Sequence, residues 1–363
     1  MLFYLTPYSS SQNSSVSYEI LNHTDGTKHY RLNVVVQESL YDYYRERTHV
    51  LSSNNDFAKF VTPYALKPIA DKLWEIYVDD EEFSNAVLMI VHQIPYEATA
   101  QPKYPVETIV DNNGDCDIFS YVAASIIKAG GLNVALLYYE NETHMNIGVN
   151  LSHAPNDVRG QVYYVTYNGV RYYIAETTGG DWQNGWRVGE CPEELRNAYV
   201  QIITLENSDQ STFGQVSASC KTLLSSAISL TISPKYLMQG GSVAFSGQLS
   251  PNLQNETITL YLKANNSPWI ILDKIKTKSD GNFVYVWNTD VAGVCYVRAS
   301  WSGNEDYAGT DSPAQTLTIL SVFFVVLFGL TLILACGGIL IFFISRRSRP
   351  AIQEPQAPEV PHI

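Results

Sequence analysis

A cysteine, a histidine and a glutamate, which together can form an activated thiol, occur in this order in the middle of the chain. Cys116 comes after the polar string NNGD and before apolar residues spaced as in a helix, so it is expected at a helix N-terminus. There the unpaired backbone N–H groups and the positive end of the helix dipole favour a thiolate, the form that attacks a carbonyl. A buried structural cysteine is the ordinary alternative at such a position.

His144 and Glu176 lie on segments that are expected to form neighbouring strands. The string THMNIGVNL places His144 at the start of an alternating strand, and QVYYVTYNGVRYYIAETT reads as a hairpin with Glu176 at its end. A helix followed by such strands can bring a thiol, an imidazole and a carboxylate together. The imidazole would then take the thiol proton and deliver one to the leaving amine, while the acid fixes the ring tautomer.

Residues near these three have expected structural roles. Asp115 precedes the thiol and is expected to cap its helix. His92 is interpreted as a structural histidine. Trp182 and Trp186 follow the acid in a Gly-rich loop, where they either wall an acyl-binding cleft or pack against the sheet.

The elements that must position these residues divide the chain into distinct regions. After an N-terminal segment, 1–27, residues 28–205 mix helical and strand spacing, which is typical of an α+β domain. Residues 206–226 are Ser-rich without regular periodicity and are predicted to be a linker. Residues 227–318 contain short alternating segments separated by Gly, Pro, Asn and Ser turns, which is typical of a β-sandwich.

An uncharged apolar run at residues 319–344 predicts a transmembrane helix, because it is longer than the roughly 20 residues that cross a bilayer. A buried soluble helix is the alternative, but the run is apolar on every side. Three arginines follow it and acidic residues precede it, so the tail, 345–363, is expected in the cytoplasm and the ectodomain outside. We therefore expect a single-pass cell-membrane protein.

The composition fits an extracellular domain and argues against several function classes. The formal charge is −13 at pH 7 and no Lys/Arg block occurs, so nucleic acid is not an expected partner. The five cysteines are scattered without a CxxC pair and no HExxH occurs, so no metal or cofactor is expected. Six N-x-S/T sites suit a glycosylated surface protein. They begin at Asn13, Asn22, Asn141, Asn150, Asn255 and Asn265.

The first residues, MLFYLTPYSSSQ, lack the basic n-region of an export signal. An outside domain of this size needs such a signal, so the recorded start is expected to be truncated or misassigned. Export through the C-terminal span is the alternative.

Five strings in order resemble the transglutaminase-like superfamily, and within it the membrane-associated archaeal and bacterial forms. They are HQIPYE, YPVETIVDNNGDCD, THMNIGV, YYIAETTG and GWRVGECPEEL, and the resemblance covers roughly residues 28–205. It implies a papain-like α+β fold with a helix packed on an antiparallel sheet. It also implies that Cys116 is the nucleophile, His144 the base and Glu176 the third member, where many relatives have Asp. Gln93 matches the position of an oxyanion-stabilising side chain.

Residues 227–318 resemble the immunoglobulin-like modules of prokaryotic surface proteins. The resemblance rests on GGSVAFSGQLSP, GNFVYVW and YVRASWSGNEDYAGTDS. It implies a spacer or adhesive stalk between the membrane and the first domain.

The expected function is that of a membrane-anchored surface thiol peptidase or amidase, which attacks amide bonds of protein or peptide substrates through an acyl-thioester. An amine acceptor in place of water would make it a protein-glutamine transglutaminase. A non-catalytic surface binding or adhesion protein is the alternative from another class. The retention of Cys116, His144, Glu176 and Gln93 together counts against that alternative.

Overall fold

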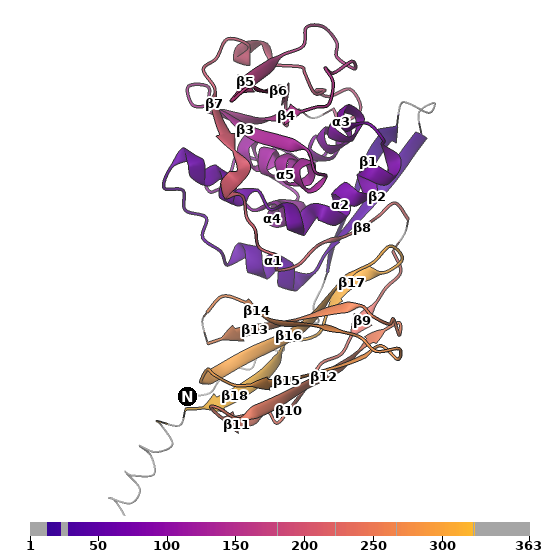
Figure 1. Ribbon diagram of the computed structural model, residues 1–363, viewed down its shortest axis with the longest axis vertical. Coiled ribbons are helices and arrows are strands. Elements are labelled where there is room, and N and C mark those ends of the chain that lie inside the picture. Colours follow the sequence, from indigo (N-terminus) through magenta and orange to yellow (C-terminus); the bar gives the residue numbers. More distant parts are fainter. Residues whose placement is uncertain are drawn as a thin grey trace, which may run out of the picture.

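The described chain forms two bodies that lie against each other (Figure 1). The computed structural model describes residues 13–22, 28–179, 181–221, 223–265, 267–321 and 323. The first body contains the α-helices and strands β1–β8, and the second contains strands β9–β18.

The described α-helices all belong to the first body. They are α1 (Glu38–Arg45), α2 (Pro63–Ile76), α3 (Asp80–Val91), α4 (Pro105–Asp111) and α5 (Cys116–Ala129), with the 3-10 segments η1 (Asn54–Phe60), η2 (Glu193–Leu195) and η3 (Leu205–Asn207). Helix α5 is buried from Ile118 to Ile127 and contacts α2, α3 and α4. It ends at Gly130, and the next residue, Gly131, has a φ of 89°, a conformation that glycine adopts readily after a helix.

A five-stranded antiparallel sheet covers one side of α5. Its order is β5-β6-β4-β3-β7, formed by β3 (Asn133–Tyr139), β4 (His144–Asn150), β5 (Tyr164–Tyr167), β6 (Val170–Ala175) and β7 (Gln201–Thr204). Because side chains alternate along a strand, Leu136 and Ile147 face the main core with α5. Leu137 and Ile174 face the other way, into a smaller core with Cys191 and Leu195.

The second sheet of the first body contains strands from the beginning and from the end of its sequence. Strands β1 (Ser14–Asn22) and β2 (Lys28–Val36) form an antiparallel pair, and β8 (Ser217–Ser219) pairs with β2. Strand β8 lies within the Ser-rich segment 206–226. That segment is also fixed by the backbone bond from Val216 N to Ala65 O, 3.0 Å.

The second body is a sandwich of two sheets. Its strands are β9 (Ala227–Ile228), β10 (Thr231–Ser233), β11 (Tyr236–Met238), β12 (Ser242–Ser250), β13 (Thr257–Ala264), β14 (Ile270–Lys276), β15 (Asn282–Asn288), β16 (Gly293–Gly303), β17 (Ala308–Asp311) and β18 (Gln315–Leu320). One sheet has the order β10-β12-β15, with β9 also on β12. The other has the order β11-β18-β16-β13-β14, with β17 also on β16. Phe245 and Trp287 of the first sheet pack with Val297 and Leu317 of the second.

Buried polar contacts join the two bodies. The Ser39 backbone N–H and hydroxyl, at the start of α1, donate to the two oxygens of Asp311 at 2.7 and 2.9 Å. Arg298, which is only 1% exposed, lies 3.6 Å from Asp42 on α1 and 3.8 Å from Asp311. Tyr261 donates to the Phe213 carbonyl at 2.8 Å. The bodies therefore share a packed interface in which opposite charges lie close together across the boundary, although Arg298 Nε and Nη1 have no hydrogen-bond partner among the described residues.

The fold class expected from the sequence is wrong. We expected a papain-like or transglutaminase-like α+β domain, an immunoglobulin-like sandwich and one transmembrane helix. The described chain is mostly β-sheet, in four sheets, because the first body adds the β1-β2-β8 sheet to its five-stranded one.

The predicted membrane span is also corrected at its start. Ile319 and Leu320 belong to β18, which pairs with β16, and Ile319 is 2% exposed in the sandwich core. Among the described residues, no helix has the length and apolar character needed to cross a membrane. Most of the expected span, 319–344, lies outside the described residues.

Candidate active site

Helix α5 begins at Cys116, the residue expected at a helix N-terminus. The thiol is free and partly exposed, and its Sγ lies 4.0 Å from the carbonyl oxygen of Thr143, just before β4. Asp115 occupies the N-cap position, but its side chain does not cap the helix. Its Oδ2 instead accepts from Thr99, at 2.8 Å from the backbone N and 3.0 Å from Oγ1. The expected capping role is therefore corrected.

His144 and Glu176 lie at the ends of adjacent strands. His144 is the first residue of β4, and Glu176 directly follows β6, which pairs with β4 through Ile147 and Ala175. The Nε2 atom of His144 is 3.1 Å from Oε1 and 3.0 Å from Oε2 of Glu176. Cys116 is also near enough to His144 to raise the pKa of the imidazole. The structure thus brings the three sequence-predicted residues together.

The charges at this site stabilise one another. Burial alone lowers the pKa of His144, but the hydrogen bonds with Cys116 and Glu176 and their charges outweigh it and raise the pKa to about 10. Burial alone would raise the pKa of Glu176, but its hydrogen bonds with His144, Thr178 and Asn146 hold it below the ordinary value. A charged imidazolium beside an ionised carboxylate is therefore the favoured state of the pair.

The Glu176 carboxylate is fully buried and receives further donors. Thr178 donates to Oε1 twice, from its backbone N at 2.9 Å and from its hydroxyl at 2.6 Å. Asn146 donates from Nδ2 to Oε2 at 3.0 Å. Sequence reasoning missed Asn146. Its position two residues after His144 on a strand, which puts both side chains on one face, was the available signal.

His92 holds the backbone on which Glu176 sits. Its Nε2 lies 3.0 Å from the Glu176 carbonyl oxygen, and burial lowers the pKa of His92, so the neutral ring donates to that oxygen. This contact agrees with the structural role expected for His92.

Gln93 is engaged away from the thiol. Its amide nitrogen, Nε2, donates to the Glu19 and Met89 carbonyls at 2.8 Å each. Its Oε1 accepts from the Glu19 backbone N at 2.8 Å. Both amide hydrogen bonds are therefore made to backbone carbonyls, one in β1 and one in α3. None of these hydrogen bonds involves Cys116, His144 or Glu176. The backbone N–H groups of the first turn of α5 are the donors closest to Cys116 along the chain.

A pair of carboxyl groups flanks Cys116. Burial and the adjacent Asp115 raise the pKa of Asp117 to about 7, and the Tyr121 hydroxyl donates to its Oδ2 at 3.2 Å. Burial alone would raise the pKa of Asp115, but hydrogen bonds from Asp117 and Thr99 outweigh it and lower the pKa. Burial and the charge of Asp115 therefore favour the protonated form of Asp117.

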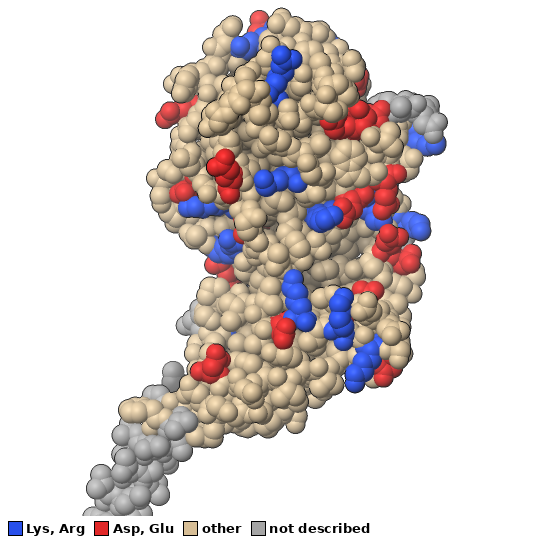
Figure 2. Space-filling model, viewed as in Figure 1, with Lys and Arg blue, Asp and Glu red and all other residues tan. Residues whose placement is uncertain are grey.

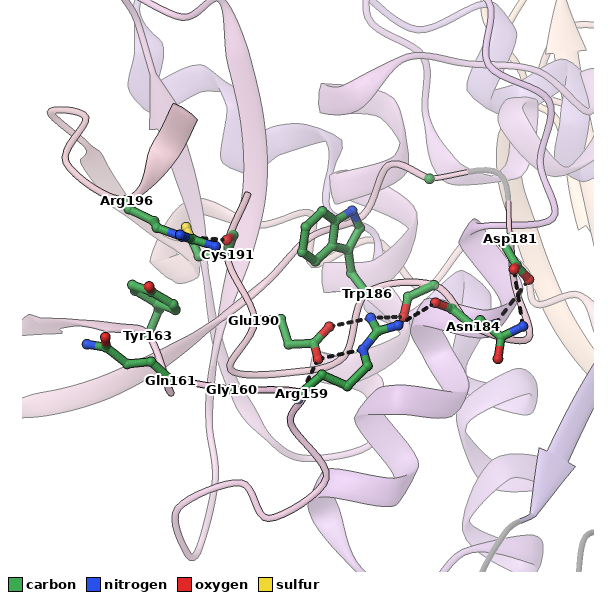
Figure 3. Close-up of a pocket in the computed structure, with 12 residues that line it drawn as sticks. Arg159, Gly160, Gln161, Tyr163, Asp181, Asn184, Trp186, Glu190, Cys191 and Arg196 are labelled. Carbon is green, nitrogen blue, oxygen red and sulfur yellow. Dashed lines mark hydrogen bonds and ion pairs between the residues drawn. The ribbon is translucent and has the colours of Figure 1, made fainter. Parts of the chain in front are cut away.

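A cavity of about 660 Å³ adjoins the loop that follows Glu176 (Figure 3). Its lining includes Tyr163, Trp186 and Arg196, and it reaches Gly179, three residues beyond the acid. Trp186 therefore walls a cavity. Trp182 lies elsewhere, stacked on His29 and lining a separate cavity of about 500 Å³.

An ion pair between Arg159 and Glu190 lines the first cavity. Arg159 contacts Glu190 through Nη2–Oε2 at 2.6 Å and Nε–Oε1 at 2.9 Å. Its remaining N–H groups donate to the Asn184 and Gly185 carbonyls at 2.8 Å each. Figure 3 shows this guanidinium between Glu190 and Asn184, with its donors turned toward both. Arg159 is thus committed to holding the loop 184–190.

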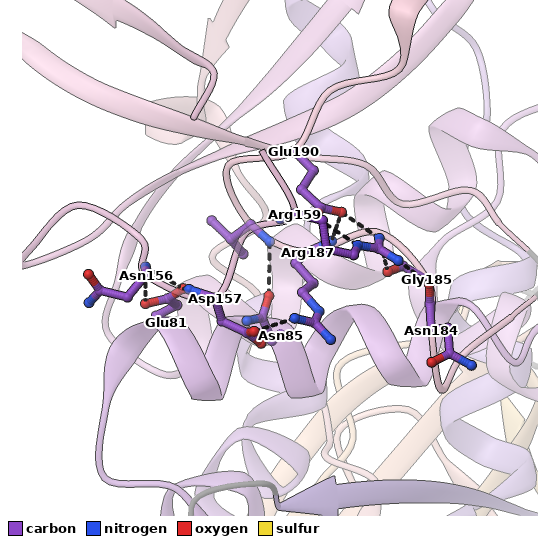
Figure 4. Close-up of polar contacts among 10 residues, drawn as sticks. Glu81, Asn85, Asn156, Asp157, Arg159, Asn184, Gly185, Arg187 and Glu190 are labelled. Atoms are coloured by element: carbon purple, nitrogen blue, oxygen red, sulfur yellow. Dashed lines mark hydrogen bonds and ion pairs between the residues drawn. The ribbon is translucent and has the colours of Figure 1, made fainter. Parts of the chain in front are cut away.

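Helix α3 anchors the same loops from the other side (Figure 4). Glu81 accepts from the backbone N of Asn156 and of Asp157, and Asn85 accepts from Val188 N at 2.9 Å. Arg187 pairs with Asp157. The walls of the cavity are therefore fixed to a rigid helix.

One group of described residues has metal-ligand spacing. The ligand atoms of Asp79, Glu81 and His153 lie within 4.8 Å of one another. Each already has a hydrogen-bond partner: His153 Nε2 contacts Asp79 Oδ2 at 2.7 Å, and Glu81 accepts the backbone bonds described above. The group therefore has a structural role as part of the loop anchor.

The visible surface mixes charges of both signs. Figure 2 shows one face on which Lys and Arg are interspersed with Asp and Glu over both bodies, and no continuous basic patch occurs on that face.

Comparisons with known proteins leave the chain without an assigned family. No family model matches it, and no curated protein matches it. Among solved structures it is similar to a chitin binding domain from Burkholderia pseudomallei, at 12% identity and a TM-score of 0.20, over 23% of this chain and 55% of that one. It is also similar to a polysaccharide monooxygenase CBM33, at 13% identity and a TM-score of 0.20, over 23% of this chain and 58% of that one. The chain therefore spans less than two thirds of either structure, and at these TM-scores the likeness carries no argument about fold or function.

Proposed function

We propose that this protein is a thiol-dependent enzyme that cleaves amide bonds of protein or peptide substrates through an acyl-thioester on Cys116. One observation carries the proposal: His144 Nε2 is held by the buried Glu176 carboxylate, and Cys116 is near enough to help raise the pKa of the same imidazole. The transglutaminase-like strings around these residues point to the same chemistry.

The two ring nitrogens of His144 have different roles. Nε2 is held by Glu176, which leaves Nδ1 to exchange a proton with the Cys116 thiol. The sulfur attacks the substrate carbonyl carbon, the C–N bond breaks, and the imidazolium gives its proton to the leaving amine. Backbone N–H groups at the start of α5 would stabilise the oxyanion.

Deacylation reverses the proton transfer. Nδ1 takes a proton from an attacking water, the C–S bond breaks, and the thiol regains its proton as the carboxylic acid leaves. An amine acceptor in place of water would give a transglutaminase by the same steps.

A non-catalytic binding protein is the competing candidate. It is disfavoured because a buried carboxylate costs free energy unless it is paired and hydrogen-bonded, and here the partner is a partly exposed imidazole beside a partly exposed thiol. A binding surface has no need of that arrangement.

The test is alkylation by iodoacetamide across pH, followed at each cysteine by mass spectrometry. Cys220 is also free and partly exposed, so it is the internal control. We expect Cys116 to react faster than Cys220 at pH 6, and His144→Ala to remove the difference. Equal rates at both cysteines, unchanged in His144→Ala, would overturn the proposal.

A second assay separates the two acceptors. Casein is incubated with the protein and a fluorescent primary amine. New peptide termini indicate hydrolysis, and fluorescence on casein indicates transamidation. A Cys116→Ala variant that is as active as wild type in both readouts would contradict the assignment of the nucleophile.

A further inference from the structure

A buried asparagine lies behind the His144–Glu176 pair. Asn146 is fully buried on β4, two residues after His144, so both side chains lie on one face of the strand. Tyr139 pairs with His144 across β3 and β4, which makes it the diagonal neighbour of Asn146 on that face. The side chains of Tyr139 and Asn146 are therefore in reach of each other beside the acid.

Glu176 determines which way the Asn146 amide points. An ionised carboxylate only accepts hydrogen bonds, so Nδ2 must face it, and Nδ2 lies 3.0 Å from Oε2. The amide oxygen, Oδ1, is then turned away from Glu176 and needs a donor of its own. A flipped amide would place an oxygen against the carboxylate.

The Tyr139 hydroxyl is the donor suited to that oxygen. Asn146 Oδ1 and the Tyr139 hydroxyl are both buried, and among the described residues neither atom has a hydrogen-bond partner. Burial raises the pKa of Tyr139 well above its ordinary value, and the neighbouring Asn146 side chain partly offsets that rise. Each group thus supplies what the other lacks.

Other titratable groups surround Tyr139. The negative charges of Glu176 and Glu142 and the Cys191 thiol all face it. Glu142 Oε2 is also buried without a partner, so it is the competing acceptor for the single Tyr139 proton. The contact between Tyr139 and the amide oxygen thus depends on that proton pointing to Asn146.

We infer that Asn146 is a positioning residue for the reaction at Cys116: Tyr139 fixes the orientation of its amide, and the amide holds the Glu176 carboxylate against His144. This inference rests on the proposed function. It extends the set of three residues to a chain of five that runs Tyr139–Asn146–Glu176–His144–Cys116.

The test measures the alkylation rate of Cys116 by iodoacetamide from pH 4 to 10. Asn146→Ala should slow the reaction at pH 6 by about 10- to 100-fold, the range found for residues that orient a ligating or reacting group. It should also move the acid limb of the profile to higher pH, because a less firmly held Glu176 stabilises the imidazolium less. Urea unfolding of each variant shows whether it is folded.

A double-mutant cycle tests the coupling of Tyr139 to Asn146. Tyr139→Phe alone should slow alkylation several-fold, but in the Asn146→Ala background it should have no further effect. Tyr172→Phe is the matched control, since Tyr172 is a buried tyrosine of the same sheet whose hydroxyl accepts from Asn133. That control should leave the profile unchanged. If Asn146→Ala fails to fold, Asn146→Ser and Tyr139→Phe carry the same test.

The outcomes separate this inference from the proposed function. If wild-type Cys116 reacts no faster than Cys220, the proposed function itself fails. If Cys116 is activated and depends on His144, but folded Asn146 and Tyr139 variants keep the wild-type profile, only the inference fails. Additive effects of the two substitutions would likewise overturn the Tyr139–Asn146 coupling.

Discussion

One nitrogen of His144 bridges both oxygens of Glu176, with Nε2 at 3.1 Å from Oε1 and 3.0 Å from Oε2. The carboxylate is fully buried, whereas the imidazole side chain is 20% exposed. The negative charge therefore lies inside the protein and the positive charge lies nearer the surface. That order suits a ring that must exchange protons at its other nitrogen.

The charge on Glu176, in addition to its shape, is expected to matter. Glu176→Gln keeps the volume but removes the negative charge that stabilises the imidazolium. Alkylation of Cys116 at pH 6 should fall by on the order of 10²-fold, since an ordinary thiol of pKa about 8.5 is under one per cent ionised there. Thr178→Val removes only a hydroxyl donor to the same carboxylate and should have a smaller effect. A Glu176→Gln variant with the wild-type rate would rule out a role for the charge.

The His144–Glu176 pair should stabilise the fold only within a pH window. The pKa of His144 is raised, to about 10, so its contribution is complete below the ordinary value of 6.5 and is lost as pH rises through about 10. The pKa of Glu176 is lowered, so its contribution is present above 4.5 and is lost as pH falls through the folded value. Urea unfolding of wild type and His144→Gln should differ most between these limits. A difference that is constant from pH 4 to 10 would contradict this linkage.

Asp117 should make stability fall as pH rises. Its pKa is raised from 3.8 to about 7, so the folded protein keeps a proton that the unfolded chain releases between those values. Asp117→Asn removes this titration, so its free energy of unfolding should fall less than that of wild type between pH 5 and 8. Asp71→Asn, at an exposed position on α2, is the control and should follow wild type. Parallel wild-type and Asp117→Asn curves would show that Asp117 is not protonated in the fold.

Gln93 is expected to affect stability and to leave the thiol unaffected. Gln93→Ala removes two hydrogen bonds to the Glu19 backbone of β1 and one to the Met89 carbonyl of α3, and leaves the Glu19 backbone groups without them. The expected loss is about 1–3 kcal/mol of unfolding free energy, measured in urea, with Cys116 alkylation unchanged. Turnover of casein provides the decisive measurement. A 10²-fold loss of turnover in a stable Gln93→Ala variant would restore the oxyanion role implied by the family resemblance.

The Arg159–Glu190 pair should hold the cavity loop closed. Arg159→Lys keeps the charge but loses the paired contacts with Glu190 and the donors to the Asn184 and Gly185 carbonyls. We expect limited proteolysis with a protease other than trypsin to cut the variant within residues 181–190 faster than it cuts wild type. Arg171→Lys, on an exposed strand position of β6, is the matched control. Equal cleavage rates in the two variants would show that the pair does not fix the loop.

The local elements around the thiol could be predicted because their periodicity is strong. The helix begins at Cys116, the strand begins at His144, and Glu176 ends a hairpin, as the spacing indicates. The hydrogen bonds of Gln93 could not be predicted in this way, because a match to a family position does not reveal that its amide bonds to the backbone of β1. Asn146 was missed because a single polar residue inside a strand has no periodic signature.

Elsewhere the sequence pattern misled for physical reasons. The alternation of Leu317 and Ile319 in β18 runs directly into a longer apolar stretch, so the boundary between strand and apolar run has no polar marker. Strand β8 is three small residues, Ser217–Ser219, whose pairing with β2 comes from tertiary contacts. Short polar strands of this kind resemble loops in sequence.

Because β8 pairs with β2, the first body is expected to be difficult to produce as a truncated protein. A polypeptide terminated at residue 205 would lack the strand that covers β2 and would present the unpaired edge of β2 to solvent, a surface prone to association with other edges. It would also lose Asp311, the acceptor for Ser39 at the start of α1. Expression of the helical half alone should therefore give aggregated material, and a recombinant fragment for enzymology must extend through Leu320.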